Sequence, residues 1–576
     1  MESQSNPLAE LSSNSSDNQR HSWVSQNFDR QKINGEARYL CKVAGCEKSF
    51  SLKGSHTVLR NHYKSGHSIN EKECFVFHED NKVNLVLKLM ARHRLPYSFI
   101  ESAEMKDLYK LFKTNKHLPC RQTVSDLFKI KAEELLAFEH SNIASAGRFS
   151  LTFDIWSPKY TTASFGCIIA HYIDQEFKLK SGLVQFQEMD FPHDATIIAK
   201  FLSDAIAQAS IPGTILAITM DNASNNTSAF ELLRHKEGFS GSVHVRCLAH
   251  VINLGVKAAL KASARFVAPV RMFVKAIKCS ISRRKQFQEI QKASTSLGSS
   301  AKVLNLVLDV DHRWNSTFKM LDRAILLKDA IDTAMVSMQA LRGMEPIDWP
   351  AVTELKDYLK QFNTATELIS GHTYPTISLV RKMIPLLTVI PSFSELYEVE
   401  ESARECSLKL NHYRAFNDQK DILVAISLDP RTKLDGFTPE ESSQTIARLR
   451  QLTGVIEESL PEANEEATEE ATEEADELLR SIFSSAATGD EITRYFAEPL
   501  RPCKTDPLAY WLSKKDDMPR LAEIARGYLS IQATSVACEQ TFSLAGLVES
   551  PRRCKLFKES FRSSVICGLL SRKNTQ

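Results

Sequence analysis

The chain has 576 residues, of which 43% are hydrophobic and 25% are charged. A chain of this length exceeds what one hydrophobic core supports, so we expect two to four domains. The composition excludes a collagen-like protein, a disulfide-stabilised small domain and a chain that is disordered throughout. The formal net charge is only +2, but residues 457–477 hold eleven acidic and no basic side chains. The rest of the chain is therefore mildly basic, which is compatible with a polyanionic partner.

The sequence carries no signal for secretion or membrane insertion. Residues 1–17 are polar, and no apolar run approaches the length that a membrane-spanning helix needs. Twelve cysteines are spread along the chain without a secretory context, so we expect reduced thiols or metal ligands.

Residues 1–21 are rich in Ser, Asn and Gln and are predicted to be disordered. The next segment, residues 22–70, contains a Cys/His cluster with the spacing Cys-x4-Cys, fifteen residues, His-x4-His. Two thiolates and two imidazoles at such paired spacings can complete a tetrahedral zinc site. A structural zinc stabilises a segment too short to fold on its own core. The predicted zinc ligands are Cys41, Cys46, His62 and His67.

Residues 28–67 carry eight Lys/Arg against three Asp/Glu, so this module is locally basic. A basic zinc module typically binds DNA, although some bind protein. The alternative is a chance Cys/His set in a small helical segment.

Residues 84–146 are predicted to be helical, because apolar residues recur three and four apart in LVLKLMARH and FIESAEMKDLYKLF. Residues 147–250 hold short β-rich runs: FSLTFDIW, FGCIIAHYI, FKLKSGLVQF, TILAITMD and SVHVRCL. A helical stretch, ATIIAKFLSDAIAQA, separates the third run from the fourth. This order predicts a mixed α/β sheet.

Residues 251–455 read as helical almost throughout. Residues 456–480 contain the acidic repeat EEAT–EEAT–EEAD and are predicted to be a solvated linker or an exposed helix. A last helical block occupies residues 490–572.

Two aspartates stand out on the predicted strands. In FSLTFDIWS the apolar residues alternate onto one face, so Asp154 falls on the other with Thr152 and Trp156. Asp221 closes the run TILAITMD at the carboxyl end of a strand, where α/β sheets usually place ligands. Two aspartates on neighbouring strands can share two divalent ions for phosphoryl chemistry. The alternative for Asp221 is a simple turn former.

A third carboxylate is needed for such a site, and the helix pattern TSVACEQTFSLAG offers one. Glu539 lies one turn from Phe542 in an otherwise apolar helix. A glutamate that points inward there requires a metal or a partner. The alternative is an exposed helical glutamate.

Several segments together resemble one family. These are the Cys/His cluster, RLPYSFIES with LPCRQTV, LTFDIWS, ITMDNASNN, RCLAHVINL, DHRWNST and the long run from DPLAYWLSKK to FSLAG. In this order the chain resembles hAT-superfamily DNA transposases with an N-terminal BED-type zinc finger, from Ser22 to Leu570. It departs from the family in having four residues between its cysteines, where two are usual, and Gln540 where an arginine is usual.

The resemblance implies a fold, namely an RNase H-like α/β mixed sheet interrupted by a large all-α insertion. A small N-terminal zinc finger and a helical C-terminal dimerisation block that completes the sheet domain would accompany it. Asp154, Asp221 and Glu539 would be catalytic and hold Mg²⁺ or Mn²⁺. Arg313 and Trp314, whose indole would stack on a flipped base, are expected at the DNA.

Cys247 and His250 match the family's Cys-x-x-His segment and are expected beside the DNA or the catalytic site. The resemblance further implies a nuclear protein that acts on double-stranded DNA as a homodimer or larger homo-oligomer. Two alternatives stay open: a domesticated, catalytically inactive transcriptional regulator, and a host RNase H-like ribonuclease.

Overall fold

The computed structural model describes residues 28–33, 36–41, 46, 48–51, 62, 82–111, 119–159, 162–294, 303–310, 313–389, 397–414, 419–454, 490–549 and 558–573. The predicted disordered start, His67 and the acidic repeat lie outside these residues. The chain divides into two compact units, Met1–Met90 and Ala91–Gln576. Within the described ranges, no helix combines the length and the apolar character that a membrane span requires.

The first unit contains a small antiparallel sheet of β1 (Phe28–Ile33), β2 (Glu36–Cys41) and β3 (Ser49–Ser51) in the order β1-β2-β3. Cys41 ends β2, and its backbone N–H donates to the carbonyl of Lys48 at 3.2 Å. Both cysteines of the predicted zinc site therefore lie at the connection from β2 to β3. Helix α3 (Lys82–His93) follows.

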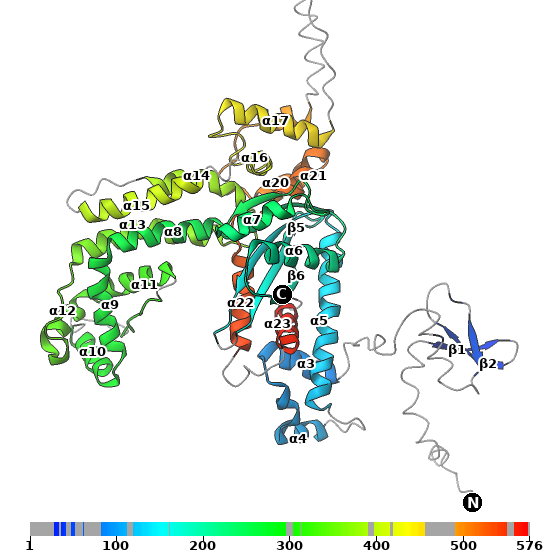
Figure 1. Cartoon of the computed structure of the whole chain (residues 1–576), viewed down its shortest axis with the longest axis horizontal. Coiled ribbons are helices and arrows are strands. Elements are labelled where there is room, and N and C mark those ends of the chain that lie inside the picture. Colours follow the sequence, from blue (N-terminus) through cyan, green and yellow to red (C-terminus); the bar gives the residue numbers. More distant parts are fainter. Residues whose placement is uncertain are drawn as a thin grey trace, which may run out of the picture. The chain divides into compact units, whose positions relative to one another are not determined.

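The second unit is built on a five-stranded mixed sheet (Figure 1). Its strands are β4 (Arg148–Trp156), β5 (Ser164–Ile173), β6 (Leu179–Met189), β7 (Thr214–Met220) and β8 (Val243–Arg246). The order is β6-β5-β4-β7-β8, with β4, β5 and β6 antiparallel and β4, β7 and β8 parallel. The mixed α/β sheet predicted from the sequence is thereby confirmed.

The two faces of β4 have different partners, as its alternating pattern predicts. Phe149, Leu151 and Phe153 are buried in a core with α6 (Ala195–Ala209) and α7 (Ser224–Leu233). On the other face, the Thr152 hydroxyl lies 3.6 Å from the thiol of Cys538, on α22 (Val536–Val548). Asp154 shares the register of this second face, so β4 directs it toward the C-terminal helices.

Helices precede the sheet in the chain: η1 (Tyr97–Glu101), α4 (Ala103–Leu111) and α5 (Arg121–Ala144). From Leu248 to Thr453 the described chain is helical apart from connecting loops and one isolated bridge. These elements are α8 (Leu248–Ala262), α9 (Ala264–Lys278), α10 (Ile281–Ser294), α11 (Trp314–Leu326), α12 (Lys328–Ser337), η2 (Gln339–Leu341), α13 (Trp349–Ile369), α14 (Ile377–Thr388), α15 (Tyr397–Arg414), α16 (Lys420–Ser427) and α17 (Pro439–Thr453).

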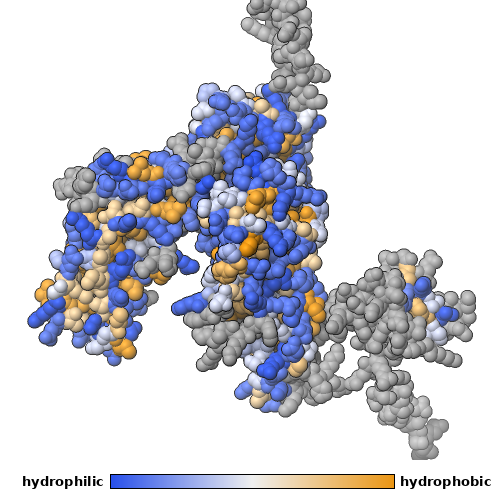
Figure 2. All heavy atoms as spheres, viewed as in Figure 1, coloured by the Kyte–Doolittle hydropathy of each residue, from blue (hydrophilic) through white to orange (hydrophobic). Residues whose placement is uncertain are grey.

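The C-terminal helices are α19 (Glu491–Ala497), α20 (Pro507–Lys514), α21 (Pro519–Tyr528), α22 and α23 (Lys558–Lys573). Helices α21 and α22 pack on β4 and β5, although almost the whole helical region separates them from these strands in the chain. One hydrophobic core runs from α8 through α21, so the helical region and the C-terminal helices fold as one body. Hydrophilic side chains cover much of the surface seen in Figure 2, with small separate apolar areas.

Candidate active site

Asp154 lies near the end of β4 and is half-buried. One carboxylate oxygen accepts a hydrogen bond from the backbone N–H of Ile155 at 2.8 Å. The pKa of Asp154 is raised from 3.8 to about 8, mainly because the carboxyl is buried and in smaller part because Asp221 and Glu539 carry negative charge. A carboxyl with such a pKa is placed where a cation would stabilise its charged form.

Asp221 follows β7 directly, next to β4 in the sheet. Its Oδ1 accepts hydrogen bonds from the backbone N–H of Ala223 at 2.9 Å and from the side-chain amide of Asn226. Oδ1 therefore has the local hydrogen bonds of a turn-forming aspartate, which is the alternative interpretation of Asp221. No hydrogen bond to Oδ2 occurs among the described residues.

Glu539 lies in the first turn of α22, where the helix dipole favours a negative charge. Its side chain is exposed, yet partial desolvation raises the pKa of Glu539. The nearby positive charges of Arg313 and His250 lower the same pKa and so act against this effect. Asp221 and Glu539 therefore act electrostatically on Asp154. Arg313 and His250 act on Glu539 in the same way, although all these residues come from distant segments of the sequence.

The charges of Asp221 and Glu539 both act on Asp154. Among the described residues, Cys41, Cys46 and His62 form the only group of three or more His, Cys, Asp or Glu residues whose ligand atoms all lie within 4.8 Å of one another, so the oxygens of the three carboxylates are more widely spaced. Two cations about 3.5–4 Å apart need ligands spread over a wider space than one cation does. Carboxylate oxygens are the ligands that Mg²⁺ and Mn²⁺ prefer, so this set fits a two-cation site.

Hydrogen bonds from the sheet fix the segment that leads into α22. The Ser150 hydroxyl on β4 donates to the carbonyl of Ser530 at 2.8 Å. The Thr219 hydroxyl on β7 donates to the carbonyl of Gln532 at 2.6 Å. The strands that carry or precede the two aspartates are therefore bonded to the segment that carries Glu539.

The helical region holds the same segment from its other side. The backbone N–H of Leu248, which begins α8, donates to the carbonyl of Ala533 at 2.9 Å. The backbone N–H of Ala533 donates to the hydroxyl of buried Thr376 at 2.9 Å. Sequence reasoning missed Thr376, because nothing in its local pattern indicates a contact 157 residues away.

Cys247, which the resemblance places beside the DNA or the catalytic site, is buried against the start of α22. Cys247 is 2% exposed, and burial raises the pKa of its thiol. Its sulfur accepts hydrogen bonds from the backbone N–H and the hydroxyl of Ser535, both at 3.5 Å. The residue thus joins the start of α8 to the start of α22 and has no surface to offer a nucleic acid.

Trp314 is also in a different environment from the one expected. It begins α11 and is 4% exposed, within the hydrophobic core of the helical region. In this arrangement the indole packs as a core aromatic and has no exposed face on which a base could stack. Arg313, one residue earlier, is exposed.

Asn226 is a site residue that sequence reasoning did not single out. It is 5% exposed, and its amide donates to the carboxylate of Asp221 five residues earlier. The run DNASNN was noted only as a polar turn. A short polar side chain in the first turn after a strand-end aspartate is the signal that could have found it.

The first unit brings three of the four predicted zinc ligands together. The ligand atoms of Cys41, Cys46 and His62 all lie within 4.8 Å of one another, and His67 is outside the described residues. The Cys46 sulfur lies 3.5 Å from Nε2 of His62. Thiolates and an imidazole at this separation fit a tetrahedral zinc ion.

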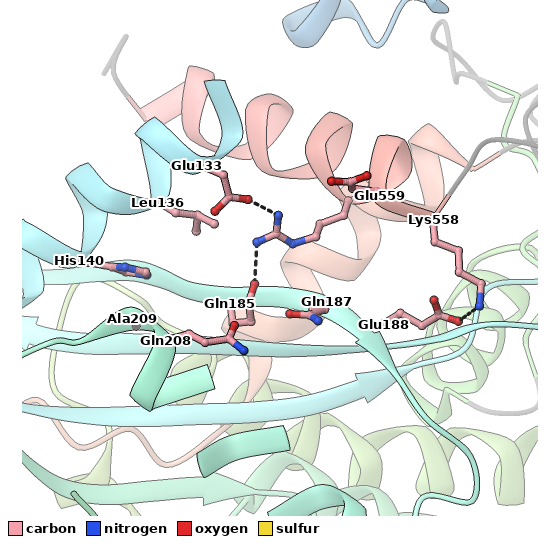
Figure 3. Close-up of a pocket in the computed structure, with 11 residues that line it drawn as sticks. Glu133, Leu136, His140, Gln185, Gln187, Glu188, Gln208, Ala209, Lys558 and Glu559 are labelled. Atoms are coloured by element: carbon pink, nitrogen blue, oxygen red, sulfur yellow. Dashed lines mark hydrogen bonds and ion pairs between the residues drawn. The ribbon is translucent and has the colours of Figure 1, made fainter. Parts of the chain in front are cut away.

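A separate pocket of about 450 Å³ lies at the edge strand β6, between α5 and α23 (Figure 3). Its charged groups are paired with one another: Arg562 with Glu133, and Lys558 with Glu188. The Arg562 guanidinium also donates to Gln185 at 3.0 Å. The pocket contains none of the three acids and serves to attach α23 to the sheet.

Three family models match the chain. Residues 152–244 match the ZBED1 RNase-like domain, residues 245–358 the ZBED1 RNase-like helical domain, and residues 491–565 the hAT family C-terminal dimerisation region. Over these three segments the chain is similar to hAT-family proteins. The RNase-like matches agree with the mixed sheet and the helices that follow it.

The alignments with related proteins cover most of this chain. A putative AC transposase from Zea mays is 25% identical over 93% of this chain and 74% of its own length. The BED zinc finger protein RICESLEEPER 2 from Oryza sativa subsp. japonica is 23% identical over 86% of this chain and 74% of its own length. Zinc finger BED domain-containing protein 4 from Homo sapiens is 24% identical over 84% of this chain and 43% of its own length.

Proposed function

We propose that this chain is a hAT-type cut-and-paste DNA transposase that acts on double-stranded DNA by divalent-metal-dependent phosphoryl transfer. The observation that carries the proposal is the assembly of Asp154, Asp221 and Glu539 from β4, the end of β7 and α22. Their electrostatic coupling supports a shared cation site. The relatives named as transposases support the reaction class.

Asp154, Asp221 and Glu539 would hold two Mg²⁺ or Mn²⁺ ions. The ions supply an activated attacking oxygen and stabilise the leaving oxygen. Three reactions would use the same site: hydrolytic cleavage at the element's end, hairpin formation on the flanking DNA, and strand transfer of the element's 3′-OH. In each of them one phosphodiester bond is broken at the oxygen that leaves, and one bond to phosphorus forms.

Arg313 and His250 would contact the DNA at this site. Both lie close enough to Glu539 to lower its pKa, so a phosphate held by the cations would lie near them. A guanidinium makes paired hydrogen bonds to a phosphate. The proposed base stacking by Trp314 stays a prediction that would require the indole to leave its core.

The finger would provide a second DNA contact. We propose that Cys41, Cys46, His62 and His67 bind a structural Zn²⁺, which the clustering of the first three supports. DNA binding through basic side chains should weaken steeply with salt. The match to the hAT dimerisation region supports a homodimer or larger homo-oligomer. A chromosomal DNA substrate would place the protein in the nucleus.

The competing proposal is a domesticated regulator that binds DNA without cutting it. Several relatives are named for their BED zinc finger, and one is named a putative transcriptional regulator. The presence of all three acids at one site favours the transposase.

A nicking assay on supercoiled plasmid with Mg²⁺ or Mn²⁺ tests the proposal. Wild type should nick the plasmid, whereas Asp154→Asn, Asp221→Asn and Glu539→Gln should lose nicking and keep DNA affinity within a small factor. Asp204→Asn on the exposed side of α6 removes the same charge elsewhere and should leave nicking intact. Zinc-dependent DNA binding without any nicking by wild type would support the regulator instead.

A further inference from the structure

Two amide oxygens beside Asp221 are buried without a hydrogen-bond partner in the described part of the chain. They are Oδ1 of Asn222 and Oδ1 of Asn226. Leaving a buried acceptor unpaired is costly, so such atoms require an explanation. Their position next to a predicted metal ligand suggests where their partners would come from.

Asn226 holds Asp221 in one orientation. Its Nδ2 donates to Oδ1 of Asp221, and the backbone N–H of Ala223 donates to the same oxygen at 2.9 Å. The two bonds occupy one carboxylate oxygen, and the described residues leave Oδ2 without a hydrogen bond. Asn222 is fixed as well, because its Nδ2 donates to the carbonyl of Cys247 at 3.2 Å.

Both asparagines therefore use their donor groups on protein atoms and keep their acceptor oxygens available. A divalent cation such as Mg²⁺ retains several water ligands in protein sites. A bound water donates hydrogen bonds and leaves no lone pair for a donor nearby, so the groups around a hydrated cation must be acceptors. Two amide oxygens and a carboxylate oxygen meet this requirement.

We propose that Asn222 and Asn226 hold the hydrated cation at Asp221, with Asn226 orienting the carboxylate and both free Oδ1 atoms accepting hydrogen bonds from metal-bound water. The inference rests on the proposed function only for the presence of a cation at Asp221. Asn226 is a positioning residue here, since it acts through Asp221 and through water.

Metal binding in the absence of DNA tests this directly. Isothermal titration calorimetry with Mn²⁺ on the zinc-saturated full chain measures affinity without any reaction. Asn226→Ser replaces the amide donor and acceptor with a single hydroxyl on a shorter side chain and should weaken Mn²⁺ binding about 10–100-fold, the range for residues that support metal ligands. Asn226→Gln keeps both the donor and the acceptor of the amide and should retain binding within about tenfold.

Asn225→Ser is the matched control, because Asn225 lies on the same turn, is exposed, and donates only to the carbonyl of His193 at 2.9 Å. It should bind Mn²⁺ as wild type does. Circular dichroism and the melting temperature, measured without Mn²⁺, show that each variant is folded. If one Asn226 variant does not fold, the other still gives the comparison.

A folded Asn226→Ser protein with wild-type Mn²⁺ affinity overturns the inference, and so does a wild-type chain that does not bind Mn²⁺. Failure of the proposed function can be distinguished from failure of this inference. Wild type that binds Mn²⁺ and shows the Asn226 effect but never nicks plasmid would retain the inference and lose the transposase. Nicking by Asn226→Ser with an unchanged Mn²⁺ requirement would retain the transposase and reject the inference.

Discussion

Neutralising Asp154 should stabilise the metal-free protein, by an amount that grows with pH. The pKa of this carboxyl rises from 3.8 to about 8 on folding, mainly because it is buried. Each pH unit between these values corresponds to about 1.4 kcal/mol, so the largest penalty is about 5–6 kcal/mol. Because Asp154 is half-buried, water screens part of its charge, and we expect about 2 kcal/mol.

The sign follows from which state carries the proton. Below pH 3.8 both the folded and the unfolded carboxyl are protonated, so there is no penalty. Between pH 3.8 and about 8 the unfolded chain ionises while the folded one keeps its proton, so stability falls as pH rises. Above this window the full penalty applies and no longer changes.

Thermal unfolding of wild type and Asp154→Asn, at pH values near both ends of this window and without added Mg²⁺ or Mn²⁺, measures the effect. The advantage of the variant should be at least about 1 kcal/mol larger at the alkaline end. Added Mg²⁺ should then stabilise wild type more than the variant, because the variant lacks one of the three charged carboxylates. Asp204→Asn is the control for loss of one negative charge. An equal difference between variant and wild type at every pH would refute the reasoning.

Three further predictions concern residues that support the site. Thr376→Val should cost about 1–3 kcal/mol and reduce nicking, because it leaves the buried N–H of Ala533 unpaired; Thr376→Ser should restore both. Cys247→Ala should lower the melting temperature and the rate of nicking while DNA affinity, measured by a gel-shift assay, stays the same. A loss of DNA affinity alone would indicate instead that Cys247 contacts DNA. Cys46→Ser should reduce the zinc content measured by atomic absorption and weaken DNA binding, with Cys503→Ser, an exposed thiol, as the control.

Local pattern was enough to predict the sheet and the position of Asp154. Alternation along β4 places its apolar residues on one face and Asp154 on the other, and both halves of that pattern occur in the structure. The third acid could not be chosen from periodicity, because an exposed glutamate near a helix start looks the same with or without a site beside it. The helix pattern offers Glu539 only as a candidate, and its role as the third acid comes from the family resemblance.

What the sequence could not predict depends on contacts between distant segments. The burial of Cys247 and Trp314 could not be predicted from the sequence, because it is decided by packing against α22 and the helical core. The sequence also could not predict that Oδ1 of Asn226 lacks a hydrogen-bond partner or that the hydroxyl of Thr376 has one in Ala533, since hydrogen-bond pairing is a property of the folded chain.

The bond between Ser150 and Ser530 joins residues 380 positions apart. During synthesis the strands leave the ribosome long before α22 does, so the nascent chain has an open sheet face and only two of its three acids. Contacts at such separation form late and slowly. A growing or truncated chain that lacks α22 would therefore hold only two of the three proposed acids, and the proposed cutting site would form only after α22 had been synthesised.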